Sequence, residues 1–272
     1  MKNSKTLNGA SSGCNDMKYI EVIEKEQGVK EVWLNRPDLH NAFNAELIEE
    51  MIALFESFKN ERLIIISGRG SSFCAGADLN WMKAMKDYSK EENFKDSKRL
   101  AKMFSAINEC DVPVLGRING HALGGGVGLV SVCDFVIANQ EALMGFTEVR
   151  LGLIPAVISP YCISKVGESN ARAWMLSGER FNAEEAKRMG LVHEICSANE
   201  LDIKVEEYKK KFLAAGPEAA KEAKRLVRGV MKNLKASEDY TCQMITERRV
   251  SAEGQEGMRA LLSKDKPAWM KA

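Results

Sequence analysis

Two glycine-rich turns are the residues of this chain whose types and spacing point most directly to chemistry. The first, 122–128, reads Ala-Leu-Gly-Gly-Gly-Val-Gly and joins a strand-like run to an apolar, helix-like run. The second, 73–78, reads Phe-Cys-Ala-Gly-Ala-Asp and follows the isoleucine-rich run 62–67. Glycine lets a main chain approach a ligand closely, and the first turn of a helix offers unpaired N–H groups. Neither turn has the spacing of a dinucleotide or P-loop fingerprint.

Taken together, the two turns predict an oxyanion site. A glycine triplet on its own is more typical of a tight helix–sheet contact, but here a second glycine turn also stands at the exit of a buried strand. Each turn can supply one backbone N–H to a single oxygen. Acyl chemistry needs this arrangement, because negative charge builds on a thioester or ester oxygen in the transition state.

The apolar pattern predicts the elements that must hold these turns. Expected elements are a hairpin over 18–34, a helix over 45–59 capped by Asn44, strands at 63–67, 112–117 and 134–138, and helices at 79–86 and 92–108. This alternation of strand and helix indicates an α/β body. From residue 157 onward the pattern is almost entirely helical, at 183–189, 201–214, 218–233, 237–252 and 256–263.

Composition bounds the function classes. With 272 residues, 45% hydrophobic and 28% charged, the chain is typical of a globular protein, and its net charge of +1 favours neither nucleic acid nor an anionic membrane as a partner. No apolar run has transmembrane length. Seven scattered cysteines without a C-x-x-C pair indicate reduced cytoplasmic thiols, with no metal site. Residues 1–16 are polar and lack the apolar core of a secretory signal, which predicts a disordered leader.

Several motifs in order carry a resemblance to a known family. They are Leu34-Asn35-Arg36-Pro37 with Asn41-Ala42, Ala75-Gly76-Ala77-Asp78, Asn119-Gly120-His121-Ala122-Leu123-Gly124-Gly125-Gly126, Gly152-Leu153-Ile154-Pro155 and the run 181–192. At these residues the chain resembles the crotonase superfamily, the enoyl-CoA hydratases and isomerases, from about Tyr19 to Ala272. The resemblance implies a crotonase-like spiral of β-β-α units over 17–200, which carries the active site. It also implies a helical region over 201–272 used in assembly of a trimer or a dimer of trimers.

The resemblance also implies where the substrate lies. The family's two oxyanion amides fall on Ala75 and Gly125. Substrate contacts are expected from the two turns, at Ala75, Gly76, Ala77, Asp78, Gly124, Gly125 and Gly128. Coenzyme A then arrives as the thioester carrier and no separate cofactor is needed; its adenine end is expected near 75–78, and Lys264 is a candidate contact for its phosphates.

Glu148 is the expected acid–base residue. Most hydratases of the family use two glutamates, one three residues after the oxyanion glycine and the other twenty residues further on. The first position is Gly128 here, and the second is Glu148. A carboxylate facing an apolar acyl pocket is desolvated, which raises its pKa toward a useful value. Cys74, Asp78, Asp134 and His121 are expected to have structural roles.

The glycine at 128 leaves two enzymatic interpretations open. One is a Δ3,Δ2-enoyl-CoA isomerase, which shuttles a proton with a single glutamate. The other is a hydratase, because the runs 148–160 and 249–262 are similar to bacterial methylglutaconyl-CoA hydratases and their isohexenylglutaconyl relatives, which also carry glycine there. On this second hypothesis glycine removes a charge and leaves volume for the substrate's own carboxylate, with Arg150 or Arg117 as its counter-ion.

A non-enzymatic interpretation is also open. One family member binds AU-rich RNA through a lysine-rich first helix, and another possibility is an inactive binding protein. Here the corresponding helix begins Ala-Glu-Leu-Ile-Glu-Glu at residue 45 and is acidic, so attraction to phosphate is weak or repulsive. Glu148 and both glycine turns are present, which favours an enzyme acting on an acyl-CoA.

Overall fold

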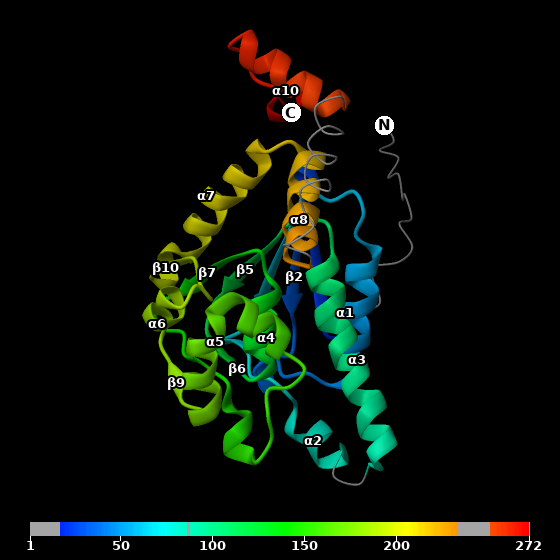
Figure 1. Cartoon of the computed structure of the whole chain (residues 1–272), viewed down its shortest axis with the longest axis vertical. Coiled ribbons are helices and arrows are strands. Elements are labelled where there is room, and N and C mark those ends of the chain that lie inside the picture. Colours follow the sequence, from blue (N-terminus) through cyan, green and yellow to red (C-terminus); the bar gives the residue numbers. More distant parts are fainter. Residues whose placement is uncertain (1–16, 86–87, 233–250, 272) are drawn as a thin grey trace, which may run out of the picture.

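Two sheets form the body of the protein. The computed structural model describes residues 17–85, 88–232 and 251–271 (Figure 1). One sheet has six strands in the order β1-β2-β3-β5-β7-β10, and the other has four in the order β4-β6-β8-β9. The strands are β1 Ile20–Lys25, β2 Val29–Leu34, β3 Leu63–Gly68, β4 Ser72–Cys74, β5 Val114–Ile118, β6 His121–Leu123, β7 Phe135–Asn139, β8 Met144–Gly145, β9 Arg180–Phe181 and β10 Glu194–Cys196.

Helices follow successive strand pairs. The α-helices are α1 Ala45–Ser57, α2 Leu79–Met85, α3 Lys90–Glu109, α4 Gly125–Val132, α5 Ser159–Ser177, α6 Ala183–Arg188, α7 Leu201–Ala214, α8 Pro217–Lys232 and α10 Ala252–Leu262. In three consecutive units the first strand (β3, β5, β7) enters the larger sheet and the second (β4, β6, β8) enters the smaller one. This repetition is the β-β-α spiral that the sequence resemblance predicts.

The larger sheet is buried on both faces. Along β3, Ile64 and Ile66 contribute to one apolar cluster, whereas Leu63 and Ile65 contribute to a second one. Helices α1, α3 and α4 supply the first cluster and α7 supplies the second. Because successive side chains of a strand point to opposite faces, a run of isoleucines is what such a strand requires.

The region after residue 157 is less uniformly helical than the sequence pattern indicates. Strand β10 adds to the edge of the larger sheet, with Glu194 opposite Ile137 in parallel register, and β9 pairs antiparallel with β8. These strands of three and two residues are too short for a period to be detected. The helix expected at 237–252 lies outside the described residues, apart from its last two positions.

Helix α4 packs very closely against its neighbours at Gly128. A Cβ atom placed on Gly128 would lie 2.3 Å from Ile158 Cγ2 and 2.8 Å from Phe104 Cε1. Phe104 belongs to α3, Ile158 directly precedes α5, and both side chains are buried. The glycine therefore sets the distance between α4 and the helices beside it.

We expect Gly128→Ala to destabilise the protein by about 1–3 kcal/mol, because the extra methyl group overpacks a filled region. Urea unfolding monitored by circular dichroism measures the change. The Gly128→Ala/Ile158→Ala double variant should lose less unfolding free energy than the two single variants lose together, since the second change removes the clashing methyl group. An unchanged unfolding midpoint for Gly128→Ala would contradict this packing.

Candidate active site

The two glycine turns meet in the structure, with backbone against backbone. A Cβ on Gly126 would lie 2.2 Å from the Cys74 carbonyl oxygen, and one on Gly76 would lie 2.8 Å from the Leu123 carbonyl oxygen. Gly76 and Gly124 also have positive φ angles of 87° and 52°, which side-chain-bearing residues rarely adopt. Glycine is therefore needed for contact between the turns as well as for approach of a ligand.

Hydrogen bonding in the turns differs from the sequence expectation at Ala75. The Ala75 N–H donates to the His40 carbonyl oxygen at 3.0 Å, so this amide is already engaged. Two residues further on, the Ala77 N–H has no acceptor among the described residues, and neither does the Gly125 N–H at the start of α4. The two free amides come from adjoining turns, since a Cβ on Gly76 would lie 3.4 Å from the Gly125 nitrogen.

Sheet pairing brings Glu148 to this place. Strand β6 pairs in parallel with β8, and the Gly124 N–H donates to the Gly145 carbonyl oxygen at 2.9 Å. Glu148 lies just beyond β8 in a 3-10 turn, Thr147–Leu151. One of its carboxyl oxygens, Oε1, lies 3.3 Å from the point where a Cβ on Gly124 would stand. The side chain thus reaches the residue next to the free Gly125 amide.

The Glu148 carboxyl is desolvated and incompletely paired. Its Oε2 atom is buried and has no hydrogen-bond partner among the described residues. Burial raises the pKa of the Glu148 carboxyl above its usual value of 4.5, and a hydrogen bond from its own backbone amide only partly offsets this. A buried acceptor without a partner is costly in a native protein, so it is a candidate for contact with a ligand or water.

The structure corrects the expectation of free volume at Gly128. Ile158 and Phe104 occupy the space where a side chain at 128 would stand. A second carboxylate has no room at this position, and neither does a substrate group. The absence of the usual first glutamate is accompanied by an apolar filling rather than an open pocket.

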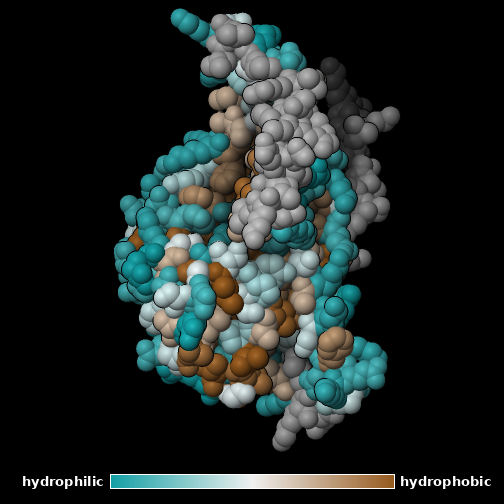
Figure 2. Space-filling model, in the orientation of Figure 1, coloured by the Kyte–Doolittle hydropathy of each residue, from teal (hydrophilic) through white to brown (hydrophobic). Residues whose placement is uncertain are grey.

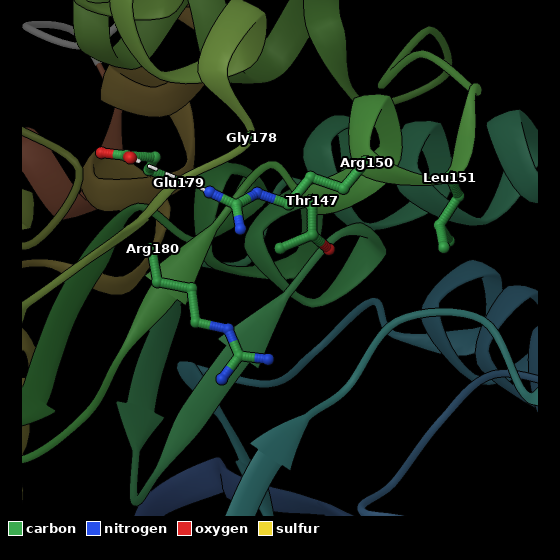
Figure 3. Close-up of a pocket in the computed structure, with 6 residues that line it drawn as sticks. All are labelled: Thr147, Arg150, Leu151, Gly178, Glu179 and Arg180. Atoms are coloured by element: carbon green, nitrogen blue, oxygen red, sulfur yellow. Dashed lines mark ion pairs between the residues drawn. The ribbon is translucent and has the colours of Figure 1, made fainter.

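Arg150 lies at the surface, in a pocket next to Glu148 along the chain. The pocket has a volume of about 590 Å³ and is lined by Thr147, Arg150, Leu151, Gly178, Glu179 and Arg180. Arg150 Nη2 lies 3.9 Å from Glu179 Oε1, and Figure 3 shows the guanidinium groups of Arg150 and Arg180 in the same pocket. Both members of the Arg150–Glu179 pair are more than half exposed, so the interaction is weak.

Arg117 and Lys264 are not brought to this site within one chain. Arg117 is held by Asp202 at 2.7 Å and by the Ser67 hydroxyl at 3.0 Å, and its guanidinium lies over the Trp33 ring. It is therefore not free as the counter-ion that the sequence suggests. Lys264 follows α10, which lies at the opposite end of the molecule from α2, the helix that follows the 75–78 turn (Figure 1).

Asp78 is tied into the turn rather than open to a ligand. Its carboxylate forms a buried ion pair with Arg36 at 2.7 Å, and it accepts the Asn80 N–H at the start of α2. Burial alone would raise the pKa of the Asp78 carboxyl, but the hydrogen bonds from Arg36 and from backbone amides outweigh it and leave the pKa lowered. The motif Asn35-Arg36-Pro37 marked Arg36 in the sequence, yet its partner was not evident from spacing.

Three other candidates have structural contacts, as expected. Asp134 accepts the Val114 N–H and pairs with Lys224, and His121 Nδ1 accepts the Leu143 N–H. Cys74 is fully buried, which raises the pKa of its thiol to about 12, so it is not a nucleophile near neutral pH.

Among the described residues there is no group of three or more histidine, cysteine or acidic side chains that suits a metal ion. None of the described helices combines the length and apolarity needed to cross a bilayer.

Exposed aliphatic side chains follow directly after Glu148. Leu151, Leu153 and Ile154 are 64%, 51% and 72% exposed, and Leu79 at the start of α2 is 73% exposed. In Figure 2, apolar residues gather toward the lower end of the face, the end where Figure 1 places α2. An apolar segment beside a desolvated carboxyl suits an aliphatic ligand and keeps water away from it.

Comparisons with known proteins show which family the chain is similar to. A family model described as enoyl-CoA hydratase/isomerase matches residues 24–272. A putative enoyl-CoA hydratase of Thermus thermophilus is 31% identical, over 82% of this chain and 83% of the relative. A short-chain-enoyl-CoA hydratase of Clostridium acetobutylicum is 30% identical, over 90% of this chain and 95% of the relative.

Solved structures show the same relationship. The crystal structure of a putative enoyl-CoA hydratase/isomerase from Legionella pneumophila is 37% identical and has a TM-score of 0.85, covering 93% of this chain and 100% of that one. An enoyl-CoA hydratase from Shewanella pealeana is 34% identical with a TM-score of 0.88, covering 93% and 97%. The sequence motifs, the β-β-α spiral and these matches agree: the chain belongs to the enoyl-CoA hydratase/isomerase family of the crotonase superfamily.

Proposed function

We propose that the protein adds water to α,β-unsaturated acyl-CoA thioesters. The observation that carries this proposal is a buried, unpaired Glu148 oxygen close to the free amides of Gly125 and Ala77. A carboxylate and two N–H donors at one place match the needs of a thioester that passes through an enolate. We assign the second donor to Ala77 in place of Ala75, because the Ala75 amide is engaged with His40.

In this mechanism Glu148 carries out both proton transfers. Its carboxylate takes a proton from water as the oxygen of that water bonds to Cβ, and the double-bond electrons move onto the thioester oxygen. The Gly125 and Ala77 amides stabilise the resulting enolate. The protonated Glu148 then delivers the proton to Cα and returns to its ionised form. A raised pKa helps the first step, because a more basic carboxylate takes the proton from water more readily.

Coenzyme A enters this reaction only as part of the substrate. We place its adenine end near the turn from Ala75 to Asp78, as the family resemblance suggests, and we propose no separate cofactor. The exposed aliphatic residues after Glu148 suit the acyl part of the substrate.

A Δ3,Δ2-enoyl-CoA isomerase is the second candidate. A specific observation favours it: Ile158 and Phe104 fill the region at Gly128, so no second carboxylate can stand there. One carboxyl group near an oxyanion site is sufficient to take a proton from Cα and return it at C4. The two reactions share the same enolate-like intermediate and differ in whether water takes part.

For the substrate class, we propose a branched acyl chain that carries its own carboxylate, such as methylglutaconyl-CoA. The surface pocket with Arg150 and Arg180 supports this proposal, whereas the Gly128 position has no free volume and does not. Arginine suits a planar carboxylate because it can donate two parallel hydrogen bonds. Arg180 has no acidic partner among the described residues, which leaves a cation available.

A non-enzymatic role in RNA binding has no support from the charge distribution. Helix α1, which corresponds to the lysine-rich helix of the RNA-binding relative, carries no lysine or arginine. Its Glu49 and Glu56 pair with Arg99 and Lys102 of α3. Such a surface offers phosphate no excess of positive charge, and we expect no nucleic-acid partner.

We also propose a homo-oligomer, a trimer or a dimer of trimers, with α8 in an interface. Charged residues of α8 face the body of the protein: Lys224 pairs with Asp134, and Arg228 pairs with Asp111. Apolar residues of α8 face outward, and Val227 and Met231 are each 63% exposed. Spaced four residues apart, they lie on one stripe of the helix, which is typical of a surface that a second copy covers.

We expect Glu148→Gln to lower hydration by about 10²–10⁴-fold, because the amide can no longer accept the proton. Purified protein is given methylglutaconyl-CoA, crotonyl-CoA and a 3-enoyl-CoA, and products are identified by mass spectrometry. Glu168→Gln, an exposed glutamate on α5, is the control. Hydration that vanishes only in Glu148→Gln supports the hydratase, isomerisation alone supports the isomerase, and full activity of Glu148→Gln contradicts both.

The same assay, run over a range of pH, measures the ionisation of Glu148. Glu148 must be ionised to accept the first proton, so kcat/KM should fall as pH drops through its pKa. Because burial raises that pKa, the acidic limb should have its midpoint above 4.5. A midpoint at or below this value would show that Glu148 is not the desolvated base.

For the carboxylate pocket, we expect the Arg150→Ala/Arg180→Ala double variant to raise KM for methylglutaconyl-CoA by about 10- to 150-fold. This range corresponds to a loss of about 1.5–3 kcal/mol for hydrogen bonds to a charged group. Crotonyl-CoA lacks the second carboxylate, so its KM should not change. Arg172→Ala on α5 is the control. Equal effects on both substrates would contradict the assignment of the pocket.

For assembly, we expect the wild-type protein to be a trimer or hexamer by light scattering after size exclusion, and Val227→Lys/Met231→Lys to be smaller, since two buried charges oppose association. Ile203→Lys, an equally exposed apolar position on α7, should leave the mass unchanged. A monomeric wild type, or a double variant of unchanged mass, would contradict the role of α8.

A further inference from the structure

A short segment, 36–43, lies against the 75–78 turn and forms hydrogen bonds with its backbone; we name this segment the strap. The His40 carbonyl oxygen accepts the Ala75 N–H at 3.0 Å, and the Phe43 carbonyl oxygen accepts the Asp78 N–H at 2.8 Å. The Phe43 N–H donates to the Gly76 carbonyl oxygen at 2.7 Å. These bonds engage the Ala75 and Asp78 N–H groups and the Gly76 carbonyl oxygen, which belongs to the same peptide unit as the Ala77 N–H. The Ala77 N–H takes no part in them and stays free.

The strap is held in a conformation that side-chain-bearing residues rarely adopt. His40 and Asn41 have φ angles of 50° and 57°, in the left-handed region. Asn41 is fully buried; its Oδ1 accepts the Arg36 N–H at 2.9 Å, and its Nδ2 donates to the carbonyl oxygens of Arg69 and Ser72. Strained backbone persists only where surrounding contacts hold it, and it is common next to functional sites.

Arg36 joins the two ends of this arrangement. Its Nη1 donates to the Ala42 carbonyl oxygen in the strap, and its Nη2 donates to Asp78 Oδ2 in the turn at 2.7 Å. The side chains of Arg36 and Asp78 are only 9% and 6% exposed, and the Tyr19 ring lies 4.8 Å from the guanidinium. One guanidinium therefore fixes the carbonyl before Phe43 and the residue after Ala77.

We propose that Arg36, through Asp78 and the strap, is a positioning residue that aims the Ala77 N–H at the thioester oxygen. This inference rests on the proposed function, in which Ala77 supplies one of the two oxyanion donors. Arg36 does not touch the substrate. It acts by holding the peptide unit before Ala77, and the donor direction with it, between two anchored points.

This role predicts a loss that appears in kcat more than in KM. An amide aimed at the oxygen interacts more strongly as negative charge builds in the transition state than it does with the neutral thioester. A small displacement of such a donor lowers the rate without removing the contacts that hold coenzyme A. A purely structural ion pair would instead reduce the amount of folded protein and leave kcat per folded molecule unchanged.

The test compares Arg36→Lys and Arg36→Met/Asp78→Asn with the wild type. The second variant removes both charges and leaves no unpaired buried carboxylate, and asparagine can still cap α2. We expect kcat on crotonyl-CoA to fall about 10- to 100-fold in both variants, with KM changed by less than about threefold. Arg117→Met, a similarly enclosed arginine paired with Asp202, is the matched control.

A spectroscopic readout reports the donor directly. In a Glu148→Gln background, which prevents turnover, the infrared carbonyl stretch of bound [1-¹³C]crotonyl-CoA shifts to lower frequency if the two amides polarise the thioester. Adding Arg36→Lys should reduce that shift, whereas Arg117→Met should not. An undiminished shift with unchanged kcat overturns the role of Arg36. No shift in the Glu148→Gln background alone overturns the proposed oxyanion site itself.

Discussion

The close contact of two backbone turns is the constraint on which the rest of the site depends. A Cβ on Gly126 would stand 2.2 Å from the Cys74 carbonyl, and one on Gly76 would stand 2.8 Å from the Leu123 carbonyl. Glycine at both places lets the start of α4 reach the 75–78 turn, so that the Gly125 and Ala77 amides belong to one surface. The smaller sheet brings the turns together, because β4 and β6 are neighbours in it, pair in parallel and end at the same edge.

Burial around this contact decides what the remaining groups can do. Glu148 reaches Gly124 from the neighbouring strand unit and loses water in doing so, which raises its pKa and leaves Oε2 without a partner. Gly128, one turn along α4 from the free amide, is instead packed against Ile158 and Phe104. The chain thus places a single desolvated carboxyl where many relatives in its family use two, and an apolar wall takes the position of the other.

Much of this arrangement could be predicted from the sequence. Glycine spacing and the isoleucine-rich strand indicated both turns, since these depend on local pattern, whereas Glu148 and the β-β-α spiral followed from the resemblance to the crotonase superfamily. The choice between Ala75 and Ala77 could not be predicted, because it depends on which amide the His40 carbonyl takes, a contact 35 residues apart in the chain. The filling at Gly128 and the Arg36–Asp78 pair also arise from tertiary contacts, and the two-residue strand β9 is too short to leave a periodic signal.

The most direct test of the oxyanion site is a crystal structure of the protein with a bound 3-hydroxyacyl-CoA or enoyl-CoA. The account predicts a thioester oxygen within about 2.7–3.1 Å of both the Gly125 and the Ala77 nitrogen atoms, with a Glu148 oxygen next to Cα or Cβ of the acyl chain. A thioester oxygen bound elsewhere, or an Ala75 amide turned from His40 toward the ligand, would contradict it.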